Sequence, residues 1–194
     1  MCIRDRHSIS PSFSASRFCL IDRGITFAIA HVRGGGDLGD KHHEKGKKKF
    51  KKNTFLDYIA CAKHLIEQRY TYKGGICFYG GSAGGLTGGA VANMAPDLFF
   101  GMLLLVPFVD TMTTMLNEKL PLTPGEWEMW GNPKKSKEYF EYILPMHLIT
   151  IFIKKITRRC LLQHLCLTTE SFTLSQLNIL QNLERQKLIT ILNY

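Results

Sequence analysis

The sequence predicts an α/β fold, with a mostly parallel sheet and helices on both of its faces. Three short apolar runs rich in β-branched and aromatic residues are typical of buried strands, and they cover residues 24–32, 75–79 and 102–106. Helical segments separate them along the chain. Strands and helices that alternate at this spacing are typical of right-handed βαβ units.

The two predicted helices differ in character. Residues 54–69 place apolar side chains at the 3.6-residue period of an amphipathic helix, and Thr54 with Asp57 predicts a capping pair at its start. Residues 83–94 are mostly small and follow a glycine-rich turn around Ser82. This second helix is therefore expected to pack closely against its neighbours.

Composition limits the class of protein. The 194 residues include 25 Lys and Arg against 16 Asp and Glu, so the net charge is 25 − 16 = +9, and 45% of the residues are hydrophobic. Such a chain can bury a core and is not of the disordered class. No run of apolar residues is long enough for a membrane span, and residues 1–6 contain no apolar segment typical of a signal peptide, so no membrane partner is expected.

The cysteines predict the compartment. They stand at positions 2, 19, 61, 77, 160 and 166, with no C-x-x-C pair and no spacing typical of a metal site. Buried thiols in a reducing compartment explain this pattern, so we expect a cytoplasmic protein without a metal or other cofactor.

A lysine-rich segment gives the chain much of its positive charge. Residues 41–52 contain seven lysines and one acid, Glu44. A solvated loop before a helix is one interpretation, and a binding site for phosphates or acidic membranes is the other. Because no aromatic residues alternate with the lysines and no nucleic-acid module is recognisable, no nucleic-acid partner is expected.

The candidate catalytic residue lies in the turn after the second predicted strand. Gly80, Gly81, Ser82, Ala83 and Gly84 fit the pattern G-x-S-x-G between a strand and a helix, the context in which this pattern positions a nucleophile. A serine in so tight a turn adopts strained backbone geometry that small neighbours permit. Its Oγ then projects from the sheet edge, and the next backbone N–H, that of Ala83, points at a developing oxyanion.

The glycines around Ser82 also have two non-catalytic interpretations. A phosphate-binding P-loop requires Gly-Lys-Ser/Thr, which does not occur in this sequence. A close-packed turn with an inert serine remains an alternative. The segment from His31 to Gly36 is similar to the oxyanion loop of esterases, but its histidine is displaced by two residues, so we predict a structural turn.

A nucleophilic serine requires an acid and a histidine, which follow the serine in this fold. The aspartates after Ser82 are Asp97 and Asp110, and the histidines are His147 and His164. Asp97 is expected at a helix end, and Asp110 comes early for a triad acid. We therefore do not expect a complete triad within this chain.

Longer strings carry a specific resemblance. Residues 80–85 (GGSAGG), 106–114 (VPFVDTMTT) and 121–133 (PLTPGEWEMWGNP) resemble the oligopeptidase B branch of the prolyl oligopeptidase family of serine peptidases, as do residues 29–39 (IAHVRGGGDLG) and 51–61 (KKNTFLDYIAC). The resemblance covers about residues 8–145.

The resemblance implies an α/β-hydrolase catalytic domain, here incomplete and without the family's β-propeller. It implies cleavage of short peptides after Arg or Lys, with Ser82 as nucleophile and the Ala83 N–H as an oxyanion donor. Glu126 and Glu128 match the acidic residues that hold the basic side chain of the substrate, and a partly desolvated carboxylate is a suitable partner for a guanidinium. Short basic peptides are thus the expected partners, and the oligomeric state is left open.

The match ends near residue 146, where the composition changes. Residues 147–194 contain no Gly, Pro or Asp, although loops depend on these residues. The codons allowed for residues 167–184, read two nucleotides later, permit YDRVFYSEPAKYIAKLR, which resembles the family segment around the triad aspartate. We expect three parts: an unmatched segment 1–6, a partial peptidase domain 7–146, and a tail 147–194 translated out of frame.

The chain is thus expected to be a fragment of a serine oligopeptidase and to be inactive by itself. Two alternatives stay open. Another α/β-hydrolase activity, that of an esterase or an acylaminoacyl peptidase, would prefer uncharged acyl groups. A non-catalytic basic fragment would bind polyanions through residues 41–52.

Overall fold

The computed structural model describes residues 13, 15–146 and 160–163. Its elements, in chain order, are α1 (Ala15–Ile21), α2 (Asp40–Glu44), the 3₁₀ turn η1 (Lys48–Phe50), α3 (Lys52–Glu67), β1 (Ile76–Gly81), α4 (Ala83–Met94), η2 (Pro96–Leu98), β2 (Phe99–Leu105), α5 (Thr111–Leu116), α6 (Thr123–Trp130), α7 (Lys137–Ile143), η3 (Leu144–Met146) and β3 (Cys160–Gln163). Except for β3, the tail lies outside the described residues, as does the unmatched segment 1–6.

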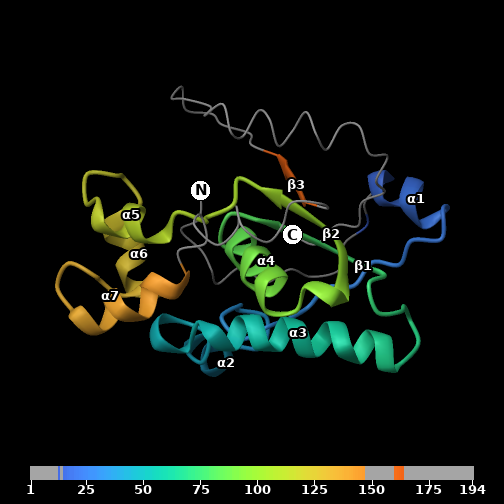
Figure 1. The fold of residues 1–194 in the computed structure, drawn as a ribbon, viewed down its shortest axis with the longest axis horizontal. Coiled ribbons are helices and arrows are strands. Elements are labelled where there is room, and N and C mark those ends of the chain that lie inside the picture. The colour runs from blue at the N-terminus through green and yellow to red at the C-terminus, as the bar shows by residue number, and fades with distance from the viewer. Residues whose placement is uncertain (1–12, 14, 147–159, 164–194) are drawn as a thin grey trace.

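The described sheet is parallel, as predicted, with strand order β1-β2-β3. In Figure 1 the three strands lie side by side, with α4 against them and α3 beyond α4. The segment β1-α4-β2 confirms one of the predicted βαβ units. Helices α5, α6 and α7 form a separate group on the side where β1 and β2 end (Figure 1).

The core lies between the sheet, α3 and α4. Phe78 of β1, Leu86 of α4 and Leu104 of β2 are almost completely buried, and the ring of Tyr58 on α3 lies 4.7 Å from the ring of Phe78. A Cβ atom at Gly88 would approach Leu104 to 2.5 Å. The small residues of α4 therefore permit the close packing that the sequence predicted.

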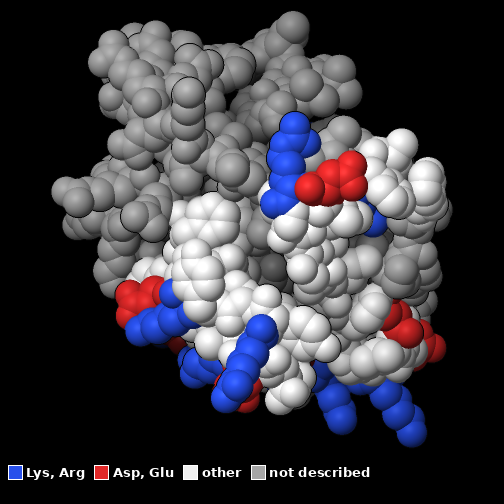
Figure 2. All heavy atoms as spheres, turned by 90° about the vertical axis from the view of Figure 1, so that its right-hand side faces the viewer, with Lys and Arg blue, Asp and Glu red and all other residues white. Residues whose placement is uncertain are grey.

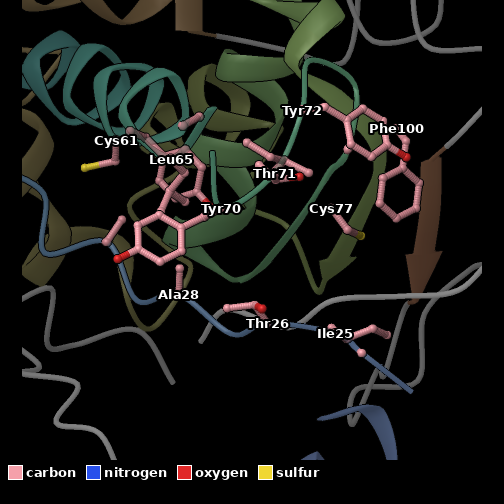
Figure 3. Close-up of a pocket in the computed structure, with 16 residues that line it drawn as sticks. Ile25, Thr26, Ala28, Cys61, Leu65, Tyr70, Thr71, Tyr72, Cys77 and Phe100 are labelled. Atoms are coloured by element: carbon pink, nitrogen blue, oxygen red, sulfur yellow. The ribbon is translucent and has the colours of Figure 1, made fainter. Parts of the chain in front are cut away.

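The predicted strand 24–32 is wrong. Residues 25–32 form no ladder with any described strand, and Thr26 and Ala28 are exposed rather than buried on both faces. A cavity of about 400 Å³ lies between this segment, α3 and β1, and its lining includes Thr26, Ala28, Tyr70, Tyr72 and Cys77 (Figure 3). An apolar run becomes a strand only where a neighbouring edge completes its hydrogen bonds, and the cavity separates this run from β1.

The predicted capping pair is also wrong. Helix α3 begins at Lys52, and neither side chain caps it. The hydroxyl of Thr54 donates to the carbonyl of Arg33 at 2.6 Å, and the Asp57 carboxylate accepts from the backbone N–H and the Nε–H of Arg33 at 3.0 and 2.7 Å. Both side chains therefore hold the glycine-rich turn after residue 32, where the backbone and side chain of Arg33 supply the donors and the acceptor. The sequence pattern did not predict these contacts.

The lysine-rich segment is folded rather than a solvated loop. It forms α2, η1 and the first residue of α3. Lys47 and Lys49 pair with Glu44 and Glu138, at 2.6 and 2.5 Å, and Lys51 is only 5% exposed. On another face, the one at the right-hand side of Figure 1, the charged side chains of the described residues lie in small groups, several of mixed sign, on a mostly uncharged surface (Figure 2).

Two further findings concern thiols and membranes. Cys61 and Cys77 are free thiols, the first half-buried and the second buried, and burial raises the pKa of the Cys61 thiol. Within the described ranges no helix is long and apolar enough to cross a bilayer, and no group of three or more His, Cys, Asp or Glu side chains could hold a metal ion.

Candidate active site

The Ser82 turn has the strained geometry that its motif predicted. Ser82 has φ 53° and ψ −116°, a left-handed conformation that a non-glycine residue rarely adopts. It stands between the buried end of β1 and the first residue of α4. Strain of this kind persists only where the surrounding structure enforces it, and it is concentrated at functional sites.

Backbone hydrogen bonds from β2 and the segment after it hold the turn. The Ser82 N–H donates to the carbonyl of Leu105 at 2.9 Å, and the Ser82 carbonyl accepts from the N–H of Phe108 at 2.9 Å. The segment between these partners contains a second left-handed residue, Val106, with φ 40°. The turn is thus held from the neighbouring strand by backbone hydrogen bonds.

The glycines around Ser82 meet different needs. A Cβ atom at Gly80 would lie 2.8 Å from the carbonyl oxygen of Gly84, and one at Gly85 would lie 2.5 Å from the Cα of Pro107. A Cβ atom at Gly84 would meet no atom within 4 Å outside its immediate neighbours. A Cβ atom at Gly81 would make only ordinary van der Waals contacts with Leu105. Close approach therefore requires glycine at 80 and 85.

Ala83 is the first residue of α4, where backbone N–H groups have no acceptor within the helix. The positive end of the helix dipole lies at the same place. A negatively charged oxygen near Ser82 would meet both. The turn thus places a serine next to the positive end of a helix.

Helix α6 carries both predicted acidic residues but presents them differently. Glu126 is 9% exposed, and its Oε2 accepts from the indole N–H of Trp130 at 2.7 Å. Glu128 is exposed. Residues two positions apart on a helix do not share a face, so α6 does not bring the two carboxylates together.

Phe108 connects Glu126 to the Ser82 turn. Its N–H holds the Ser82 carbonyl, and its ring centroid lies 5.3 Å from that of Trp130, the partner of Glu126. No sequence pattern predicted a role for Phe108, Trp130 or Lys51. Glu126 and Trp130 are four residues apart, about one helical turn, but only the structure shows that both are buried and in contact.

The remaining triad candidates are unsupported within the described residues. Asp97 pairs with Lys73 at 3.2 Å on the surface, and Asp110 precedes α5 as its N-terminal flanking residue. His147 and His164 lie outside the described residues. The segment from His31 to Gly36 is a structural turn, as predicted, with the carbonyl of Gly34 2.7 Å from the buried ring of His43.

Comparison with known proteins assigns the family. A sequence model described as the prolyl oligopeptidase family matches residues 11–165, which extends beyond residue 146. The chain belongs to the prolyl oligopeptidase family. Its members have an α/β-hydrolase catalytic domain, and the parallel sheet with the β1-α4-β2 unit is the corresponding part of this chain.

Individual relatives of the prolyl oligopeptidase family agree with this assignment. Protease 2 of Moraxella lacunata is 52% identical over 130 residues, and dipeptidyl aminopeptidase BI of Pseudoxanthomonas mexicana is 47% identical over 137 residues. These alignments cover 67% and 71% of this chain but 19% of each relative. The chain thus spans about a fifth of the length of the curated relatives it matches.

Solved structures give the same result. Oligopeptidase B from Leishmania major superposes with a TM-score of 0.73 at 42% identity, over 82% of this chain and 22% of that one. Oligopeptidase B from Trypanosoma brucei, with antipain covalently bound, superposes with a TM-score of 0.69 at 50% identity, over 73% of this chain and 20% of that one. The chain is similar to oligopeptidase B in both sequence and fold.

Proposed function

We propose that the complete protein containing this sequence is a serine peptidase that cleaves short peptides after Arg or Lys. The observation that carries the proposal is the strained conformation of Ser82 between a buried strand and the start of α4. The similarity to oligopeptidase B supports it, as does the covalent antipain complex of one relative.

In the proposed reaction the Ser82 Oγ attacks the carbonyl carbon of the scissile bond, and a histidine accepts its proton. The Ala83 N–H stabilises the oxyanion that forms. The tetrahedral intermediate expels the amine, which takes up the proton from the histidine, and leaves an acyl-enzyme that water hydrolyses. The acid and base of the triad are expected after residue 146.

Glu126 is the proposed partner for the basic side chain of the substrate. It is buried, held by a hydrogen bond and connected to the Ser82 turn through Trp130 and Phe108. A guanidinium that enters this site would meet a desolvated carboxylate, whose charge-assisted hydrogen bonds are strong. Glu128 is proposed to act from the exposed face of α6, in a supporting role.

Substitution of Glu126 tests the specificity. In the complete protein, Glu126→Gln should lower kcat/KM for an Arg-amide substrate by about 100-fold, because a lost hydrogen bond to a charged group is worth about 1.5–3 kcal/mol. Acylation of Ser82 by a small reagent should change little. Equal losses in both reactions would contradict the assignment of Glu126 to side-chain recognition.

The alternative α/β-hydrolase activities make a different prediction. An esterase or acylaminoacyl peptidase would process uncharged acyl groups at least as well as basic ones. Comparison of Arg-amide with Leu-amide turnover decides between them, since equal rates would contradict preference for basic residues. Tight, salt-sensitive binding to heparin without labelling of Ser82 would instead support a non-catalytic basic fragment.

Two further parts of the proposal concern the chain and its location. On the reading-frame hypothesis, the triad acid and base are lost from the chain as written, which is then inactive. Resequencing of the codons for residues 140–194 tests this, because an uninterrupted frame would contradict it. The free thiols of Cys61 and Cys77 suit a cytoplasmic location, which localisation of the tagged protein would check.

A further inference from the structure

Trp130, the last residue of α6, lies at the meeting point of the two parts of the proposed site. It is 2% exposed, and its indole N–H donates to Glu126 Oε2 at 2.7 Å. One neighbour of its ring is Phe108, with 5.3 Å between ring centroids and 55° between ring planes. The other is the ammonium of Lys51, whose Nζ lies 4.7 Å from the ring centroid.

The indole hydrogen bond determines how the Glu126 carboxylate is presented. An indole is a donor only, so this contact cannot be made in the opposite sense. A hydrogen bond to a buried carboxylate is charge-assisted and fixes the side-chain rotamer. Because a carboxylate offers about four lone-pair positions, one indole donor leaves acceptor capacity for a guanidinium.

Lys51 supports this arrangement through the face of the Trp130 ring. It is 5% exposed, although lysine is almost never fully buried without a partner. An ammonium over an indole is held by the electrons of the ring face, and this attraction increases when the pair is desolvated. A cation on that face withdraws electron density from the ring, which makes the indole N–H a better donor to Glu126.

Contact with Phe108 ties the position of the carboxylate to the nucleophile. The N–H of Phe108 holds the Ser82 carbonyl at 2.9 Å, and its ring packs on Trp130. Two consecutive contacts thus join the Ser82 turn to Trp130, and a third joins Trp130 to Glu126. The distance between the reacting hydroxyl and the carboxylate is therefore set through Trp130.

We propose that Trp130, supported by Lys51, is the positioning residue that gives Glu126 its selectivity for basic side chains. The inference rests on the proposed function, because it concerns the same substrate site. Loss of the indole N–H removes one of the contacts that orient the Glu126 carboxylate, so basic substrates bind less well. The chemistry at Ser82 is left unchanged where an aromatic ring remains at position 130, because Phe108 then keeps its ring neighbour and its hydrogen bond to the Ser82 carbonyl.

The test uses the complete peptidase with Trp130→Phe, which keeps an aromatic ring and removes the N–H donor. The ratio of kcat/KM for Arg-amide over Leu-amide should fall by about 10-fold or more, mainly through KM. The rate of Ser82 labelling by a small acylating reagent should stay within about 2-fold of that of the unsubstituted protein. This rate is the control for folding, because a general loss of structure would lower it. An unchanged substrate ratio would overturn the proposal.

Helix α6 supplies a matched control. Trp127 also donates its indole N–H, but to the carbonyl of Met115 at 3.1 Å rather than to a carboxylate. Trp127→Phe therefore removes the same donor from the same helix and should leave the substrate ratio unchanged. An equal fall in both variants would mean that the ratio reports the stability of α6, which overturns the proposal.

Three further variants guard against misfolding of Trp130→Phe. Benzothienylalanine at position 130 keeps the bicyclic shape and replaces the N–H by sulfur, so it should reproduce the loss of selectivity. Lys51→Met keeps an apolar stem without the charge and should lower the ratio by about 3-fold, whereas Lys51→Arg should preserve it. Full selectivity with benzothienylalanine would overturn the role of the N–H.

Glu126→Gln separates failure of this inference from failure of the proposed function. If Glu126→Gln leaves the Arg-to-Leu ratio unchanged, the specificity assigned to Glu126 fails, and the inference fails with it. If Glu126→Gln abolishes the preference while Trp130→Phe preserves it, only the inference fails. Loss of preference in both variants, with Trp127→Phe unaffected, is the expected result.

Discussion

Two glycine-rich turns in this protein are built in opposite ways. In the turn at residues 33–36, the left-handed position is a glycine, Gly34 with φ 103°, and side chains of Thr54, Asp57 and His43 hold the backbone. In the turn at residues 80–85, the left-handed position is Ser82 with φ 53°. Glycine adopts the left-handed conformation of the first turn without backbone strain, whereas the serine of the second turn is strained.

The difference shows how a structural turn can be distinguished from a candidate catalytic one. Both have a glycine-rich sequence. The turn at residues 33–36, called the Arg33 turn below, is held by side chains from elsewhere in the chain, and it has glycine where the other turn has serine. The Ser82 turn is held by the backbone of the segment at residues 105–108 and keeps a non-glycine residue at its strained position.

The largest expected effect is on activity at the strained serine. In the complete protein, Ser82→Ala should lower kcat by about 10⁶-fold while leaving the fold intact, because the nucleophile is lost but the turn is held by backbone hydrogen bonds. Peptide turnover and thermal unfolding measure the two quantities. Retained turnover would make Ser82 an inert turn residue and would remove the contrast between the two turns.

The next effect is on stability at the left-handed glycine. Gly34→Ala should lower the free energy of unfolding by about 3 kcal/mol, because alanine is strained at φ 103° and its Cβ would lie 3.0 Å from the Gly46 carbonyl. Gly84→Ala is the control, since its Cβ would meet nothing within 4 Å and its φ is not left-handed. Equal changes in denaturant unfolding would contradict this account of the Arg33 turn.

A pH-dependent effect tests the side chains that hold the Arg33 turn. Burial raises the pKa of the Asp57 carboxyl, but the hydrogen bonds and charge of Arg33 outweigh burial, so the net pKa is lowered. A lowered folded-state pKa stabilises the protein above the unfolded value, about 4, and this contribution is lost as the pH falls through the folded value. Asp57→Asn should cost about 2 kcal/mol at pH 7 and progressively less below pH 4.

The control for this effect is an exposed ion pair. Glu44 pairs with Lys47 at 2.6 Å, and the side-chain hydrogen bond from Lys47 lowers the pKa of its carboxyl. Glu44→Gln should leave the unfolding midpoint unchanged, since solvent screens such pairs. If Asp57→Asn were equally silent from pH 3 to 7, the ion pair would not be what holds the turn.

The smallest effect concerns the strain itself. Ser82→Gly should be more stable than Ser82→Ala by about 1 kcal/mol, because glycine adopts φ 53° without a Cβ penalty. Thermal unfolding of the two inactive variants measures the difference directly. Greater stability of the alanine variant would mean that the serine turn carries no strain and that the two turns differ only in sequence.

The sequence by itself determined the local features whose physical causes are local. The period of the apolar residues predicted α3, the small residues after the glycine-rich turn predicted α4, and the apolar runs predicted β1 and β2. The motif around Ser82 predicted strained backbone geometry at the serine, since a tight turn between strand and helix permits few conformations.

Only the tertiary structure decided what depends on contacts between distant residues. Residues 24–32 have a strand-like sequence but lack a neighbouring edge among the described strands, and Thr54 and Asp57 contact Arg33 rather than cap α3. Burial of Lys51 against Trp130, 79 positions away, follows from how η1 and α6 meet. A pattern along the chain reports periodicity, whereas the partner of a buried charge is determined by packing in three dimensions.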